Sequence, residues 1–253
     1  MLEESFGIKL SRSSRRWVVG VAVAFVVAHV LVVAVWLALP SVSSGRGPTR
    51  RSMCMNHLKQ IGFALHNYHD QWGSFPPAVT YGPDGEPWHS WRVLILPYLD
   101  QSPLYDQYDF DEPWDGPNNL SVTRVQLHVY QCPSANMLFK NETHYFAVTG
   151  ANTVFPPSGC CSLNQITDGS SNSLATFERS GSDVPWAAPI DPVFDPARLP
   201  GDPFGSLGAR SYHSSSCQFL FCDGAVRGLS PDIPPDTFRN LVEINDGTSP
   251  VEF

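Results

Sequence analysis

Positively charged side chains are scarce in most of this 253-residue chain. After residue 51 there are nine Lys and Arg against 22 Asp and Glu, which gives this part a net charge near −13. A surface with so much negative charge repels the phosphates of nucleic acids and of anionic lipid headgroups. The composition therefore excludes nucleic acid as a partner and is compatible with cation binding.

Motifs of common catalytic chemistry are also missing. The chain has no Gly-x-Ser-x-Gly, no His-Glu-x-x-His and no Cys-x-x-Cys, the patterns typical of serine hydrolases, zinc peptidases and dithiol sites. His66 and His69 are spaced to share a helix face, but such a pair more often faces solvent or caps a loop than binds zinc. The sequence predicts a protein that is not an enzyme.

One apolar run, residues 17–39, contains no charged residue. A helix of this length spans roughly 34 Å, enough to cross a hydrocarbon core of about 30 Å. Basic residues abut the run on its N-terminal side, at Lys9, Arg12, Arg15 and Arg16. The positive-inside rule then predicts a cytoplasmic tail over residues 1–16, a transmembrane helix over 17–39 and an extracytoplasmic remainder.

A cleaved signal peptide is the alternative interpretation of this run. The small residues Ser41 and Ser43 would suit a cleavage site. However, the apolar part of a signal peptide usually has about 7–15 residues, and this run is longer. We therefore expect an uncleaved anchor.

Residues 40–51 are rich in Pro, Gly and Ser and predict a linker, after which residues 52–253 form one domain. An amphipathic helix is predicted over residues 53–70, with Ser52 as its N-cap. Its apolar side chains are spaced by three and four residues, at Leu58, Ile61, Leu65 and Tyr68. This stripe needs a sheet or another helix to cover it.

Apolar patterns predict the remaining elements of the domain. A short helix is expected over residues 91–99, stopped near Pro97, and a closing helix over 237–244. Five segments predict strands: residues 126–130, 144–149, 173–177, 218–222 and 225–229.

The last two predicted strands are joined by Asp223-Gly224, which is typical of a two-residue type I′ hairpin turn. In that register Phe219, Phe221 and Val226 share one face of the sheet and are candidates for the core.

Five ordered segments resemble the bacterial domain-of-unknown-function family 1559, over about residues 52–245. They are residues 53–78, 89–119, 130–134, 166–174, and His213 followed after nine residues by Asp223-Gly224. The resemblance implies a pseudopilin-like α+β fold, in which an N-terminal helix packs on an antiparallel sheet. It implies partners among other envelope, secretion or pilus-like components. Family members often carry a prepilin-type leader, and no Gly-Phe-Thr-Leu-Ile-Glu-like segment precedes residue 17.

Within the family signature, we interpret His213, Asp223 and Gly224 as an element of folding. Asp223-Gly224 makes the turn, and His213 lies at or before the start of the strand, where its ring can bond neighbouring backbone or cover the sheet edge.

The six cysteines form an even set in a domain that we expect in an oxidising compartment, so some of them are expected to pair. Cys54 and Cys132 lie inside the family segments, and the resemblance therefore points to these two as the first disulfide candidate. Cys217 and Cys222 are five residues apart on one predicted strand, so they point to opposite faces and should not pair with each other.

Acidic residues cluster between two predicted elements, and their carboxylates are the hard oxygen ligands that Ca²⁺ requires. Their spacing is not that of an EF-hand. The alternative is a solvated acidic loop whose aromatic side chains, Tyr105, Tyr108 and Trp114, pack inward. The candidate calcium ligands are Asp106, Asp109, Asp111, Glu112 and Asp115.

The sequence therefore predicts a membrane-anchored, pseudopilin-like protein with a structural or assembly role and with no cofactor other than this candidate calcium. A cell-surface module that binds a solute or a glycan is the alternative, suggested by the aromatic residues of segment 105–114 and by Trp186. An open aromatic cleft would favour the binding module, whereas an exposed apolar patch or a bare sheet edge would favour the assembly subunit.

Overall fold

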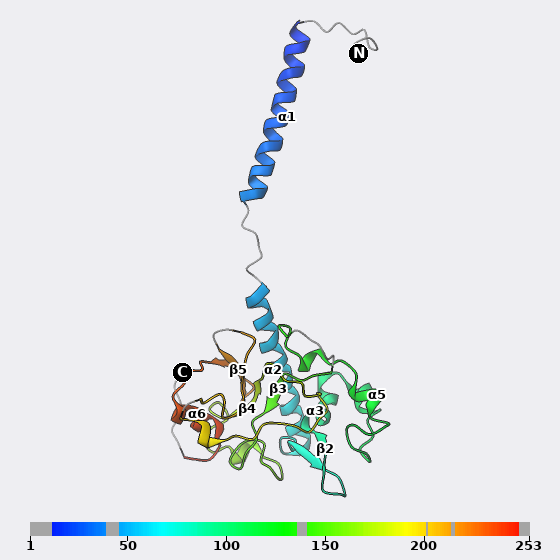
Figure 1. Cartoon of the computed structure of the whole chain (residues 1–253), viewed down its shortest axis with the longest axis vertical. Helices are drawn as coiled ribbons and strands as arrows, with labels where there is room; N and C mark the ends of the chain where they lie inside the picture. Colours follow the sequence, from blue (N-terminus) through cyan, green and yellow to red (C-terminus); the bar gives the residue numbers. More distant parts are fainter. Residues whose placement is uncertain (1–11, 39–45, 136–140, 201, 214–215, 248–253) are drawn as a thin grey trace. The chain divides into compact units, whose positions relative to one another are not determined.

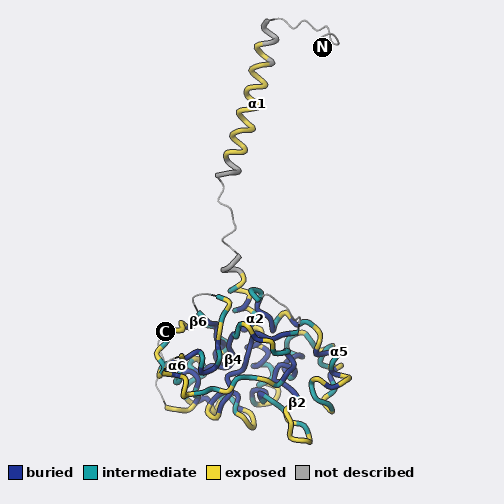
Figure 2. Tube along the Cα trace, viewed as in Figure 1, coloured by how far each residue is buried: buried dark blue, intermediate teal, exposed yellow. Residues whose placement is uncertain are grey.

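The structure is a computed structural model that describes residues 12–38, 46–135, 141–200, 202–213 and 216–247 (Figure 1). The chain divides into two compact units between Arg46 and Gly47. The first unit contains helix α1 (Arg12–Ala38), and the residues of α1 whose burial is described are exposed (Figure 2). Residues 1–11 of the predicted tail and Leu39, the last residue of the predicted span, lie outside the described residues.

Helix α1 covers most of the predicted transmembrane segment. Within the described part of the chain, however, no helix combines the length and the apolar character that a membrane span requires.

Helix α2 (Arg46–Trp72) belongs to the second unit from Gly47 onward. Its start lies before Ser52, so the predicted N-cap is wrong and residues 46–51 of the predicted linker are helical. Pro48 is compatible with this start because the first turn of a helix has no intrahelical partners for its N–H groups. Gly73, with φ +76°, ends the helix by donating its N–H to the His69 carbonyl at 2.7 Å.

The apolar stripe of α2 is confirmed. Leu58, Ile61 and Leu65 are buried, and Tyr68 is half-buried against the same core. The helix approaches the sheet so closely at Gly62 that an added Cβ would lie 2.8 Å from Leu220 Cδ1.

The sheet has four antiparallel strands in the order β3 (Tyr145–Ala147), β4 (Leu174–Glu178), β5 (Cys217–Phe221) and β6 (Val226–Leu229). The α+β class with an antiparallel sheet is thus confirmed. The predicted strand over residues 126–130 is wrong, because its end forms a 3-10 turn, η3 (His128–Tyr130), closed by Tyr130 N–H donating to the Leu127 carbonyl.

Each face of the sheet has its own core. Helix α2 covers one face, which presents Tyr145, Ala147, Ala175 and Leu220. On the other face Phe146, Phe177 and Phe219 pack with Phe238, Leu241 and Val242 of helix α6 (Pro235–Val242). Helix α6 confirms the predicted closing helix.

The shorter elements lie mainly between α2 and β3. The predicted helix over residues 91–99 is split into α3 (Trp91–Leu94) and η2 (Leu96–Leu99). Pro97 has no N–H for an α-helical bond to the Val93 carbonyl, so α3 ends near this proline, as predicted. The short elements are β1 (Val79–Tyr81), β2 (Pro87–Ser90), α3 (Trp91–Leu94), η2 (Leu96–Leu99), α4 (Ser102–Tyr105), α5 (Leu120–Thr123), η4 (Leu163–Gln165) and η5 (Pro196–Arg198).

The β5–β6 hairpin corrects the predicted turn. Phe221 N–H donates to the Ala225 carbonyl at 2.8 Å, so the loop has three residues, and of these only Gly224 has positive φ, at +83°. A type I′ turn needs two such residues in a two-residue loop. The extra residue shifts the register, so Val226 pairs with Leu220 on the α2 side. Phe219 and Phe221 lie on the other side, and the predicted shared face of all three is wrong.

Candidate functional site

Two cysteine side chains from distant parts of the chain meet at the end of the α2–sheet core. Cys54 lies on α2, and Cys132 follows η3 by two residues. Both are fully buried, and their Sγ atoms are 2.6 Å apart. The structure records both as free thiols. It therefore brings together the pair named from the family resemblance, and the disulfide itself stays a prediction.

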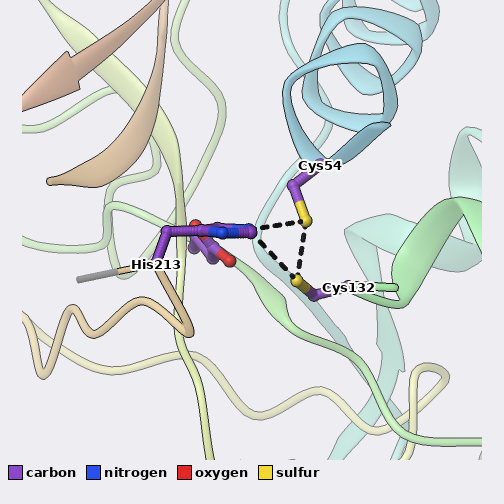
Figure 3. A group of neighbouring side chains, drawn as sticks. Cys54, Cys132 and His213 are labelled. Atoms are coloured by element: carbon purple, nitrogen blue, oxygen red, sulfur yellow. Dashed lines mark hydrogen bonds between the residues drawn. The ribbon is translucent and has the colours of Figure 1, made fainter. Parts of the chain in front are cut away.

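The ring of His213 faces both sulfurs (Figure 3). Its Nε2 is 3.5 Å from Cys54 Sγ and 3.9 Å from Cys132 Sγ. His213 does precede β5, as expected, but its ring points to the two thiols and does not cover the sheet edge. The sequence did not predict this contact between the imidazole and the two thiols.

Glu178, the last residue of β4, completes a cluster of four side chains. Its carboxylate and the ligand atoms of Cys54, Cys132 and His213 all lie within 4.8 Å of one another. We call these four residues the dithiol cluster. It joins α2, the segment after η3, the end of β4 and the segment before β5.

The Glu178 carboxylate is fully buried and only partly satisfied. Its Oε2 accepts a hydrogen bond from Ser211 Oγ at 2.9 Å, whereas its Oε1 is buried without a hydrogen-bond partner. Burial raises the pKa of Glu178, and the Ser211 hydroxyl, the Cys132 thiol, the Gln218 N–H and the positive charge of Arg51 oppose that rise. A buried carboxylate oxygen of this kind is costly unless a proton or a cation compensates it.

The Cys132 thiol and the His213 imidazole are both shifted toward their uncharged forms. The hydrogen bond with Cys54, followed by burial, raises the pKa of the Cys132 thiol. Burial and then the charge of Arg51 lower the pKa of His213. Arg51 is held beside the cluster by a hydrogen bond from Nη2 to Ser216 Oγ at 2.7 Å.

A second layer of hydrogen bonds fixes the backbone that carries the two cysteines. Tyr145 donates its hydroxyl to the Cys54 carbonyl at 3.4 Å. His57 Nδ1 donates to the Gln131 carbonyl at 3.0 Å, and Cys132 N–H donates to His144 Nδ1 at 3.2 Å. The backbone at the two cysteines is therefore held in place by the surrounding fold.

A cavity of about 750 Å³ reaches the dithiol cluster at His213. Three of the few cations of this unit, Arg179, Arg198 and Arg210, line it together with Ser211. His213 is half-exposed to this cavity, whereas the other three members of the cluster are buried.

The five candidate calcium ligands, Asp106, Asp109, Asp111, Glu112 and Asp115, lie in the loop between α4 and α5. In the described chain the dithiol cluster is the only group of three or more His, Cys, Asp or Glu whose ligand atoms converge. Glu112 Oε1 instead accepts the N–H of Asn119 at 2.6 Å. Tyr108 packs inward, as the alternative interpretation expects. Calcium binding by this loop stays a prediction.

Sequence reasoning selected Cys54, Cys132 and His213 but missed Glu178. Nothing in the local pattern distinguishes it, because it is one acidic residue at the end of an apolar strand. The other part of the signature, Asp223-Gly224, lies at the β5–β6 turn, where Asp223 Oδ1 accepts the Ala225 N–H at 2.8 Å.

Comparison with known proteins gives one match. A family model described as a protein of unknown function (DUF1559) matches residues 43–199, more than half of the chain. No curated protein and no solved structure matches the chain.

Proposed function

Because the chain belongs to the DUF1559 family of proteins of unknown function, which assigns it no activity, we propose its role from its own architecture. It is a membrane-anchored, extracytoplasmic, pseudopilin-like protein that serves in the structure or assembly of an envelope complex and catalyses no reaction. Its partners on this proposal are other envelope, secretion or pilus-like components.

The anchor part of the proposal rests on the sequence of residues 17–39. This run is uncharged, and the described Val and Leu side chains of α1 are 46–63% exposed. The basic flank before residue 17 supports a cytoplasmic N-terminus and an extracytoplasmic location for residues 52–253.

The assembly role is supported best by what α2 and the sheet leave uncovered. One face of α2 packs on the sheet, but Phe63 on its other face is 67% exposed. The sheet edge at β3 is covered, because Ala147 N–H donates to Asp191 and the Tyr145 carbonyl accepts from Arg92. At the opposite edge no other described strand pairs with β6. An exposed aromatic side chain and an unpaired strand edge are features that subunit contacts use.

The absence of catalysis is supported by the state of the dithiol cluster. A cysteine nucleophile needs a lowered pKa and access to substrate. Cys132 has a raised pKa and is fully buried, as is Cys54.

Crosslinking in native membranes followed by affinity purification tests the assembly role. We expect a stoichiometric set of envelope proteins with the wild type and its loss with Phe63→Asp. Tyr81→Asp is the matched control, since Tyr81 is a comparably exposed aromatic residue, 57% accessible, on β1. Recovery of the wild-type chain without partners, or equal loss of the partner proteins with Phe63→Asp and Tyr81→Asp, would contradict the proposal.

A surface module for a solute or glycan remains the second candidate because of one pocket. A pocket of about 420 Å³ is lined by Tyr68, Trp72, Tyr98, Tyr105 and Phe110. Trp72 is 62% exposed, and exposed aromatic rings of this kind suit sugar faces. Trp186, which also suggested this role, is fully buried and cannot contribute. Saturable glycan binding by the full chain that Trp72→Ala abolishes would favour this candidate.

A further inference from the structure

We propose that Cys54, Cys132, Glu178 and His213 bind one Zn²⁺ ion. Two thiolates, an imidazole and a carboxylate are the donors that zinc takes in proteins, usually four in a tetrahedron. Tetrahedral bonds of about 2.0–2.3 Å place neighbouring ligand atoms roughly 3.3–3.8 Å apart. The distances from His213 Nε2 to the two sulfurs, 3.5 and 3.9 Å, agree with this geometry.

The position of the sulfurs requires one adjustment. Their separation of 2.6 Å must open by about 1 Å to admit a metal between them. Cys132 lies outside regular secondary structure, between η3 and Pro133, so a shift of its side chain does not disturb the sheet.

Glu178 supplies the independent observation that points to a cation. Its side chain is fully buried at the end of a central strand, and its Oε1 has no hydrogen-bond partner. The other oxygen is held by Ser211, which fixes the carboxylate toward the cluster. Metal-binding carboxylates are commonly oriented by such a neighbouring donor.

A disulfide explains less of the arrangement. It would account for the proximity of the two sulfurs, but it would leave Glu178 Oε1 without a partner and would give no reason for His213 to face the sulfurs (Figure 3). The two states exclude each other, because sulfurs joined in a disulfide provide no thiolate for the metal. The disulfide predicted from the sequence is therefore the direct competitor of this site.

The charges of the bound state balance closely. Two thiolates and one carboxylate contribute three negative charges, Zn²⁺ contributes two positive charges, and two thiol protons leave to solvent on binding. Arg51, held beside the cluster by Ser216, opposes the remaining negative charge. Four protein ligands leave no open position, which makes this a structural site that ties α2 to the end of β4 and to the segment before β5.

The test uses the full chain purified in mild detergent under a thiol reductant. We expect one zinc per chain by elemental analysis, and after exchange into Co²⁺ the absorption bands of a tetrahedral, thiolate-ligated cobalt ion. Glu178→Gln keeps the acceptor for Ser211 and should weaken zinc binding at least tenfold. Cys161→Ser, which changes a buried cysteine outside the cluster, should leave zinc binding unchanged.

Three results would overturn the site. The first is a disulfide between Cys54 and Cys132 in protein purified without reductant, seen as a mass two hydrogens lower and as linked peptides, together with no zinc uptake after reduction. The second is wild-type protein whose cobalt spectrum lacks thiolate bands. The third is zinc that survives unchanged in both Glu178→Gln and Cys132→Ser. The cobalt spectrum is measured on the wild type, so it decides the matter even if a variant fails to fold.

Discussion

The buried ion pair between Arg92 of α3 and Asp191 offers a sharp test of how the fold is held together. The two side chains are 0% and 1% exposed, and Arg92 Nη2 is 2.6 Å from Asp191 Oδ1. Arg92 also donates to the Tyr145 carbonyl and to Ser90 Oγ. Asp191 accepts further hydrogen bonds from Ala147 N–H at 2.7 Å and Trp91 Nε1 at 3.2 Å. The pair thus joins the loop after Trp186 to the edge of β3.

Arg92→Met removes the cation and leaves the Asp191 carboxylate buried. Breaking one side of a buried pair costs about 3–5 kcal/mol, a large share of the roughly 5–15 kcal/mol that stabilises a typical domain. For a domain of about 200 residues this lowers the melting temperature by roughly 6–20 °C. Burial already raises the pKa of Asp191, and Arg92 opposes that rise. In the variant the carboxyl therefore takes up a proton more readily, and the loss of stability becomes smaller as the pH falls.

Thermal and urea unfolding of the full chain, followed by tryptophan fluorescence, measures this loss. Arg198→Met is the matched control, because Arg198 pairs with Asp195 at the surface, where the side chains are 68% and 47% exposed. Such exposed pairs contribute at most about 1 kcal/mol. Equal losses of stability in Arg92→Met and Arg198→Met would refute the argument that burial makes the Arg92–Asp191 pair the more stabilising of the two.

Two further predictions concern the turn and a buried histidine. Gly224→Val should lower the free energy of unfolding by about 1–2 kcal/mol, because φ at this position is +83°. Gly224→Asn should lower it by less, and equal melting temperatures for the wild type and the two variants would contradict this prediction. Burial lowers the pKa of His144 to about 4. Between pH 6.5 and 4 the unfolded chain binds a proton that the folded chain does not, so stability falls as the pH falls, by at most about 3 kcal/mol. His144→Asn, which keeps an acceptor for the Cys132 N–H, should remove this part of the pH dependence in urea titrations, and an unchanged slope would show that His144 is not its source.

Local patterns predicted the elements that have a regular apolar period or a short apolar run. The stripe of α2 follows from spacings of three and four residues, because one face of the helix is buried. Strands β3, β4 and β5 are instead short, mainly apolar runs, because both faces of the sheet are covered. The β5–β6 turn was predicted with the wrong loop length, since Asp-Gly suits both two-residue and three-residue hairpins and only the partner register decides between them. This one-residue difference moved Val226 to the opposite face.

Long-range polar contacts were not predictable in the same way. Arg92 and Asp191 are 99 residues apart, and neither lies in a pattern that names the other. Glu178 is likewise one of many acidic residues, and only the pairing of β4 with β5 brings it to Cys54, Cys132 and His213. Side chains of this kind gain their roles from tertiary contacts, whereas the family resemblance could select only the residues inside its motifs.

The most direct test of the proposed role determines on which side of the membrane residues 52–253 lie. Intact spheroplasts that express the full chain are treated with protease, and the products are detected with separate tags at the two ends. The account predicts that the C-terminal tag and the domain are digested while a short N-terminal fragment containing residues 17–39 stays in the membrane. Full protection of the domain until the cells are lysed, or release of an intact domain without protease, would contradict it.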